Sequence, residues 1–201
     1  MRPVRLVVYS DYLCPWCYVA DVRLGQLQRE VGADLELEWR SFLLRPEPDP
    51  RRTLEKFKRY TESWARPAAE EPSAGFRVWS TDEGPPSHSI PPHLAAKAAA
   101  TLGGDAFERM HERLLRAYFS ENRDITDRET LRVIWREIGL PDEEFARIDE
   151  PSLQREVLQQ YREAIELGVE GVPAVRAADV AITGAQPLET YRRWVAKLLR
   201  G

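Results

Sequence analysis

The sequence predicts an α/β fold in which both ends of the chain supply strands to one sheet and a long helical segment lies between them. Three observations indicate this arrangement. The chain opens with a strand–helix–strand pattern and closes with a strand–strand–helix pattern. Between these ends, nine of the fifteen prolines fall within residues 46–92, where they interrupt any sheet. We therefore expect a discontinuous domain of residues 1–44 and 168–201, with a helical insertion domain of residues 45–167.

The opening unit is predicted from changes in hydrophobic period. Residues 4–9, "VRLVVY", form a short β-branched run that is typical of a buried strand. Apolar residues then recur at helical spacing as far as Val31, and Gly32 is a suitable stop for the helix. The stretch "DLELEWRSF" alternates apolar and charged residues, which predicts a half-buried strand. A strand, a helix and a strand in this order place parallel neighbours in a sheet.

The insertion is predicted to be helical because apolar residues recur at helical spacing in several segments. Thr53 caps the first helix, which we expect to end at Pro67. A long loop follows, as far as residue 92. Further helices are expected at residues 93–102, 105–120 and 153–167, and after a capping box formed by Thr126 and Glu129.

The closing unit returns to strand patterns. The stretch "PAVRAADVAITG" predicts two short strands around a tight turn at residues 177–179. The stretch "QPLETYRRWVAKLLR" predicts a final helix with Pro187 near its first turn. Because neither end of the chain can bury its strands alone, the two ends must meet in one sheet.

The composition narrows the class of protein. With 43% hydrophobic and 31% charged residues, the chain has the composition of an ordinary soluble protein. Its formal charge of −4 and its lack of a basic block argue against nucleic acid or a membrane surface as partner. The first apolar run is too short for a signal peptide, and no stretch approaches a membrane span. We expect a cytoplasmic protein, and monomer and homodimer both stay open.

The only two cysteines, Cys14 and Cys17, lie in "YSDYLCPWCY" at the end of the first predicted strand. A bridge across so few residues removes little chain entropy, and a permanent disulfide is not expected in a reducing cytosol. Unpaired N–H groups and the helix dipole favour a thiolate at a helix start. We therefore predict that Cys14 is an exposed nucleophile and that Cys17, one turn inside, is the buried thiol that resolves a mixed disulfide.

Two neighbours of the cysteines are candidate supporting residues. Pro15 suits the first helical turn, because its missing N–H has no intrahelical partner there. Asp11 lies three residues before Cys14, where it is a candidate helix cap or proton relay. The alternative for Asp11 is an exposed loop aspartate.

A second candidate segment is "GVEGVPAV", which places Pro173 at the start of a predicted strand. Together with the cysteine pair, it points to a cis Val172–Pro173 peptide bond. Such a turn sets the Val172 backbone beside the sulfurs, where an extended substrate segment can pair with it. A trans proline that begins an edge strand is the alternative.

A metal site is not predicted. Structural zinc needs four ligands, and the chain offers the two cysteines with His88, His93 and His111. His111 falls within the apolar face of its predicted helix, so a packed histidine is the simpler interpretation. His88 and His93 are separated by two prolines and do not share a helix face.

With these motifs in this order, the chain resembles the DsbA-like branch of the thioredoxin superfamily, and in particular the FrnE-like oxidoreductases. The resemblance spans nearly the whole chain and rests on the stretches "SDYLCPWCY", "WRSFLLRPE", "LLRAYFSENRDITD", "LGVEGVPAV" and "ITGAQPLETY". It implies a thioredoxin fold interrupted by an all-helical domain, with Cys14 as nucleophile, Cys17 as resolving cysteine and Pro173 in cis. One departure is His88-Ser89, where the family tends to carry Asn-Thr or Asn-Ser.

Three functions are kept in view. The first is a cytoplasmic thiol–disulfide oxidoreductase that acts on protein or small-molecule disulfides and thiols, with no bound cofactor and with glutathione as a candidate redox co-substrate. The second is a glutathione-dependent isomerase or transferase of the 2-hydroxychromene-2-carboxylate isomerase type, whose relatives generally carry serine at the position of Cys14. The third is a non-enzymatic metal-binding or chaperone-like protein with a cleft lined by Trp16, Trp64, Phe76 and Trp79.

The residue pair between the cysteines leads to a first prediction. Trp16 cannot donate a charge-assisted hydrogen bond to a thiolate, as a protonated histidine could, so the reduced form is less stabilised than in DsbA. We expect the Cys14–Cys17 couple to have a reduction potential between those of thioredoxin and DsbA, roughly −270 to −120 mV. Equilibration with defined ratios of reduced to oxidised glutathione measures it, and a value outside this range would contradict the expectation.

Overall fold

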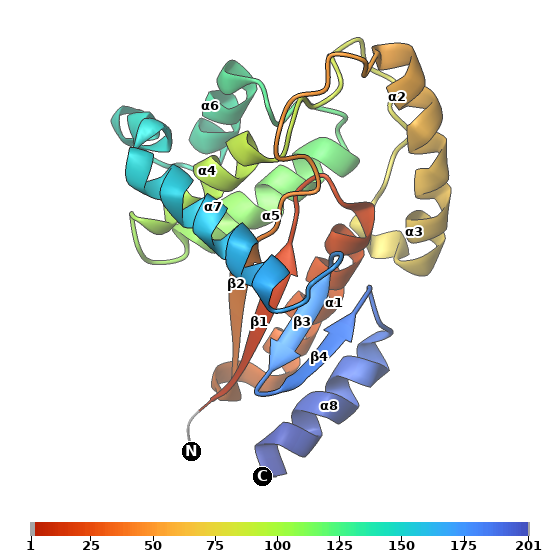
Figure 1. The fold of residues 1–201 in the computed structure, drawn as a ribbon, viewed down its shortest axis with the longest axis vertical. Coiled ribbons are helices and arrows are strands. Elements are labelled where there is room, and N and C mark those ends of the chain that lie inside the picture. The colour runs from red at the N-terminus through yellow and green to blue at the C-terminus, as the bar shows by residue number, and fades with distance from the viewer. Residues whose placement is uncertain (1–2, 201) are drawn as a thin grey trace.

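A computed structural model describes residues 3–200 of the chain (Figure 1). The strands are β1 (Val4–Ser10), β2 (Leu35–Ser41), β3 (Ala174–Ala177) and β4 (Val180–Thr183). The α-helices are α1 (Pro15–Val31), α2 (Leu54–Thr61), α3 (Ala65–Glu70), α4 (Ile90–Ala100), α5 (Ala106–Phe119), α6 (Arg128–Glu137), α7 (Pro151–Glu166) and α8 (Leu188–Arg200). Short 3-10 helices are η1 (Gly32–Asp34), η2 (Glu62–Trp64), η3 (Pro72–Ala74) and η4 (Asp142–Asp149).

The two ends of the chain share one four-stranded sheet in the order β2-β1-β3-β4, which confirms the predicted fold class. β1 pairs with β2 in parallel from Val4 to Ser10. On its other side, β1 pairs with β3 in antiparallel register, with Tyr9 opposite Ala174. β3 and β4 form an antiparallel hairpin, and Ala178 in its turn has a positive φ of 47°. The central strand β1 therefore joins the opening and closing units.

Helices cover both faces of this sheet. On one face, Leu24 of α1 and Tyr191 of α8 pack with Leu6 of β1 in a fully buried cluster. On the other face, Ala164 of α7 packs with Tyr9 of β1. The sheet therefore lies between two layers of helices. The carboxyl ends of β1 and β2 point toward the remaining helices (Figure 1).

The remaining helices, α2 to α6, gather beyond those strand ends around a core of their own (Figure 1). Its largest fully buried side chains include Trp64, Trp135 and Tyr118. Two residues from the start of α1 and the turn before it, Tyr18 and Tyr12, belong to the same cluster. The turn between β1 and α1 is therefore packed against the helical segment as well as against the sheet. The predicted domain boundaries at residues 44 and 168 stay a prediction.

Some prolines that were predicted to end a helix or to lie in a loop instead lie in the first turn of a helix. Pro67 does not end a helix, because α3 begins at Ala65 and continues past it to Glu70. Likewise, α4 begins at Ile90 and holds Pro91 and Pro92 in its first turn. The physical reason is that the first backbone N–H groups of a helix have no intrahelical partner, so proline loses nothing there.

The predicted capping box at Thr126 is wrong by one residue. Asp127 is the N-cap of α6, and its carboxylate accepts a hydrogen bond from the Thr130 N–H. The Thr126 hydroxyl instead donates to Asp124 and accepts the N–H of Ser87 from the long loop. Thr126 is therefore used to hold that loop, a role that depends on a distant segment.

Within residues 3–200, none of the helices has the length and apolar character needed to cross a bilayer.

The packing of the helical core gives a stability prediction. Leu114 of α5 is fully buried, whereas Leu167 at the end of α7 is 49% exposed. We expect Leu114→Ala to lower the free energy of unfolding by about 2–5 kcal/mol, because it removes buried methyl groups and leaves a cavity. The matched change Leu167→Ala should stay within about 0.5 kcal/mol of the parent. Urea denaturation of both variants makes the comparison, and equal losses would contradict this account of the core.

Candidate active site at the cysteine pair

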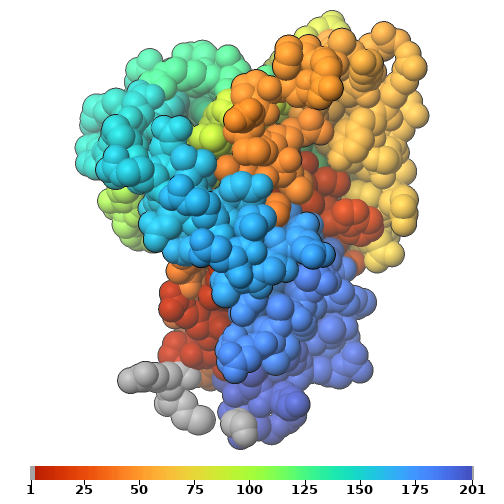
Figure 2. All heavy atoms as spheres, viewed as in Figure 1, coloured from red at the N-terminus to blue at the C-terminus, as the bar shows by residue number. Residues whose placement is uncertain are grey.

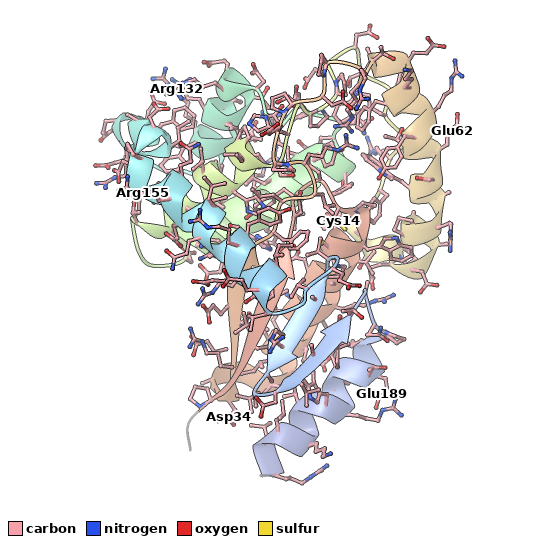
Figure 3. The ribbon with its side chains drawn as sticks, viewed as in Figure 1. Cys14, Asp34, Glu62, Arg132, Arg155 and Glu189 are labelled. Atoms are coloured by element: carbon pink, nitrogen blue, oxygen red, sulfur yellow. The ribbon has the colours of Figure 1, made fainter. Side chains whose placement is uncertain are left out.

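The cysteine pair occupies the first turn of α1 (Figure 3). Cys14 is the N-cap residue, with an extended backbone at φ −97° and ψ 113°, and Pro15 follows at the first helical position. The Cys14 N–H donates to the Asp11 carbonyl at 3.1 Å, and the Cys14 carbonyl accepts the Cys17 N–H at 3.0 Å. This turn puts the Cys14 sulfur at the positive end of the helix dipole, where a thiolate is stabilised.

The segment before β3 faces this sulfur. The Val172–Pro173 peptide bond is cis. The Cys14 thiol donates to the Val172 carbonyl at 3.4 Å, across 158 residues of sequence. Ala174, the residue after Pro173, is held in the sheet opposite Tyr9. The pairing of β1 with β3 therefore brings the Val172 backbone to the cysteine pair.

Both thiols are free, and both are buried. Cys17 is fully buried, as predicted, but Cys14 is only 5% exposed, so the prediction of an exposed nucleophile is wrong. The cause is tertiary, because the Val172 backbone covers the Cys14 sulfur. Pro15 and Trp16 are half-buried beside it. The start of α1 reaches the surface between the segment that contains α2 and α3 and the segment that leads into β3 (Figure 2).

The surroundings of Cys17 make its thiol a weak acid. Burial raises the pKa of the Cys17 thiol well above its ordinary value, and the neighbouring Cys14 sulfur raises it further. The Asp11 backbone N–H and the Ser10 hydroxyl act in the opposite direction, but they do not overcome burial. Cys17 therefore stays protonated until a base removes its proton. The arrangement suits a pair in which Cys14 attacks first and Cys17 second.

Asp11 is fully buried, so neither the exposed-loop interpretation nor the helix-cap interpretation holds. Its Oδ1 accepts the Leu13 N–H and its Oδ2 accepts the Leu44 N–H, both at 2.7 Å. Burial raises the pKa of this carboxyl, while hydrogen bonds from Ser89 and from the two backbone groups lower it. Asp11 thus ties the turn before Cys14 to the chain that leaves β2 and to the start of α4.

The histidines named from the sequence lie in different surroundings. His93 is buried and its Nε2 lies 3.1 Å from the Phe42 carbonyl. Burial lowers the pKa of His93 to about 3, so its ring is neutral and donates to that carbonyl. His88 pairs with the Ser87 hydroxyl, and burial lowers its pKa. Within residues 3–200, no three His, Cys, Asp or Glu side chains gather as a metal site would need.

His111 has two partners that sequence reasoning missed, the buried Tyr12 and the half-buried Asp21. Its Nδ1 lies 2.8 Å from the Tyr12 hydroxyl, and its Nε2 lies 3.1 Å from Asp21 Oδ1. These contacts join α5 to the turn before Cys14 and to α1, across 99 and 90 residues. No local sequence pattern connects residues at such separations.

The aromatic residues proposed to line a client cleft do not form one. Trp64 and Trp79 are 1% and 2% exposed and belong to the helical core. Phe76 packs against that core and contacts Trp64 edge-on. Only Trp16, which is half-buried, lies at the cysteine pair. These side chains therefore stabilise the fold and offer no aromatic surface to a client.

Comparison with known families agrees with the fold. A family model described as a DSBA-like thioredoxin domain matches residues 5–196, and the chain belongs to this family. Over 203 residues the chain is 27% identical to the uncharacterized protein YwbO of Bacillus subtilis (strain 168), covering 96% of each chain.

Two solved structures illustrate the likeness. A putative protein disulfide isomerase from Nitrosomonas europaea superposes with a TM-score of 0.81 at 16% identity, with 98% of each chain covered. The cytosolic disulfide reductase DsbM from Pseudomonas aeruginosa, solved with GSH, superposes with a TM-score of 0.77 at 25% identity. That comparison covers 98% of this chain and all of the other.

The buried Asp11 carboxylate leads to a prediction about stability and pH. In Asp11→Asn one of the two backbone N–H groups faces an amide NH₂ and loses its acceptor, which should cost about 1–3 kcal/mol. Because the folded state raises the pKa of Asp11, its stabilising contribution is complete below its ordinary value of 3.8 and declines as pH rises through the folded pKa. The loss of unfolding free energy caused by the substitution should therefore shrink as the pH rises above about 4.

Denaturant unfolding of parent and variant at a series of pH values measures this difference, in which the other titrating groups cancel. If the stability difference between parent and variant grows with pH, the folded state lowers the pKa of Asp11 and the predicted direction is wrong.

Proposed function

We propose that this protein is a thiol–disulfide oxidoreductase that cycles between the dithiol and the disulfide of Cys14 and Cys17. The observation that carries the proposal is the position of Cys14, at the N-cap of α1 and 3.4 Å from the Val172 carbonyl. A helix start favours the thiolate, and the backbone beside it can pair with an extended substrate. We assign the chain to the FrnE-like branch on its motifs.

The reaction has two exchange steps. The Cys14 thiolate attacks one sulfur of a substrate disulfide, forming a mixed disulfide and releasing the other sulfur as a thiolate. Cys17, once deprotonated, attacks the Cys14 sulfur, so the protein disulfide forms and the second substrate sulfur leaves with its electron pair. The substrate gains two electrons and the protein loses two. In the opposite direction the same steps oxidise a dithiol substrate.

Of the two directions of electron flow, the likeness to DsbM supports reduction of substrate disulfides, in the cytoplasm. DsbM is described as a cytosolic disulfide reductase and was solved with GSH. By analogy, glutathione is a candidate reductant that returns the Cys14–Cys17 disulfide to the dithiol. Protein disulfides and small-molecule disulfides are both candidate substrates.

The alternative of a glutathione-dependent isomerase or transferase shares the fold but requires a different chemistry. Such an enzyme activates bound glutathione and has no need of a second cysteine. Here Cys17 lies one helical turn from Cys14, and the Cys17 N–H donates to the Cys14 carbonyl at 3.0 Å. Cysteine at both positions therefore favours redox cycling.

Cysteine variants test the proposal. Insulin reduction driven by a small thiol should be lost in Cys14→Ser, because no nucleophile remains. Cys17→Ala should instead accumulate a mixed disulfide between Cys14 and the substrate, seen as a mass increase under non-reducing conditions. The exposed variant Leu167→Ala serves as the unaffected control. If catalysis survives Cys17→Ala and depends on glutathione, the isomerase or transferase alternative holds instead.

A further inference from the structure

A basic surface pocket lies between the chain that leaves β2 and helix α2. Residues 45–60 carry six lysines and arginines against three acidic residues, in a chain whose formal charge is −4. The pocket has a volume of about 440 Å³, which falls within the range of ligand sites. Its charged lining, among the described residues, consists of Arg45, Asp49, Arg51, Arg52 and Lys56. The pocket is therefore a local concentration of positive charge on a protein that is acidic as a whole.

Half of the cations in residues 45–60 are not neutralised by the protein. Three of the six form ion pairs: Arg51 with Asp49, Lys58 with Asp82, and Arg59 with Glu55. The acidic residue of the pocket is therefore already bound to an arginine. Arg45, Arg52 and Lys56 form no ion pair with a carboxylate within residues 3–200. These three side chains are available to an anionic ligand.

The Arg52 guanidinium is fixed in position before any ligand arrives. It lies 4.4 Å from the centre of the ring of Phe57, which is buried, and its Nη1 donates to the Pro86 carbonyl at 2.5 Å. A planar guanidinium presents paired N–H donors that match a carboxylate. Because Arg52 is already held, less side-chain entropy is lost when it binds an anion.

The pocket is connected to the redox site through Leu44 and Arg45. The Leu44 N–H donates to Asp11 Oδ2 at 2.7 Å, and the Cys14 N–H donates to the Asp11 carbonyl at 3.1 Å. Arg45 follows directly, and Ser89 binds both its N–H and its carbonyl. Figure 1 shows this segment rising from β2, past the turn between β1 and α1, to α2. The side chain of Leu44 is 46% exposed, so the surface between Cys14 and the pocket is open to a substrate.

We propose that this pocket binds carboxylate side chains of a polypeptide whose disulfide is exchanged at Cys14, so that the protein prefers substrates with acidic residues near their cysteines. The inference rests on the proposed function and names its substrate class. A ligand that meets Cys14 and the pocket at once must extend past Leu44. A polypeptide does so readily, since an extended chain advances by about 3.3 Å per residue.

The overall charge of the protein predicts the opposite preference. A protein with a formal charge of −4 repels an acidic peptide, so general electrostatics would make an acidic substrate react more slowly than a neutral one. A local excess of positive charge beside the site reverses this order, because it attracts the substrate over the last few ångströms and holds it there. The order of the two rates therefore separates the pocket from the net charge.

Two synthetic peptides measure this order. Each carries one cysteine joined in a disulfide to thionitrobenzoate, and the four residues on each side of the cysteine are glutamates in one peptide and glutamines in the other. The Cys14 thiolate attacks the peptide sulfur, a bond forms between these two sulfurs, and thionitrobenzoate leaves with the electron pair as a coloured thiolate. At low ionic strength we expect the reduced full-length protein to exchange about tenfold faster with the glutamate peptide. The preference should disappear in 1 M salt, which screens the charges.

The double variant Arg45→Gln, Lys56→Gln should lower the ratio of the two rates to one or below, because the pocket loses two of its unpaired charges. The matched control is the double variant Arg155→Gln, Arg193→Gln, which changes the net charge equally. These two arginines are exposed, and they lie on α7 and α8, which contribute nothing to the pocket lining within the described residues. The control should keep most of the preference for the glutamate peptide.

The inference is overturned if the parent shows no preference for the glutamate peptide, or if the pocket variant keeps that preference. It is also overturned if both double variants lower the ratio equally, which a general effect of net charge would produce. A parent protein that releases no thiolate from either peptide would overturn the proposed oxidoreductase function, and this inference with it.

Discussion

The antiparallel pairing of β1 with β3 is the contact on which the redox centre depends. It runs from Val7 to Tyr9 on β1, and it is the only strand pairing that joins the two ends of the chain among the described residues. Neither end forms a stable sheet alone, because a strand pair or hairpin is marginal without further strands or a packed face. When the two ends pair, the Val172 carbonyl comes to lie beside Cys14. The same contact therefore completes the sheet and assembles the site.

The turn between β1 and α1 shows how the helical segment takes part in that site. Its polar side chains are buried, and each finds a partner on a different segment: Asp11 at Leu44, and Tyr12 at His111. Buried polar groups need such partners, since an unsatisfied one costs as much as a lost hydrogen bond. The segment between β2 and β3 therefore supplies hydrogen-bond partners to the turn that precedes the cysteine pair, and is not an independent addition to the sheet.

Local chemistry explains which parts of the fold could be predicted. The strands at both ends, the helix start at Cys14 and the turn at residues 177–179 follow from hydrophobic period and from turn-forming residues, which act over a few positions. Three of the errors have a common cause. Thr126, Cys14 and Asp11 were assigned from their sequence neighbours, but each is positioned or covered by a segment at least 30 residues away. Hydrophobic periodicity and the spacing of motif residues carry no information about such contacts.

The sequence by itself determined the element types, the location of the thiol pair at a helix N-terminus and the family to which the chain belongs. These depend on backbone preferences and on short motifs, which are local properties. Only the tertiary structure decided that Cys14 is covered, that Asp11 is a buried acceptor of two backbone N–H groups, and that His111 contacts both Tyr12 and Asp21. Burial and long-range hydrogen bonds decide these properties, because solvation and partners exist only once distant segments have packed together.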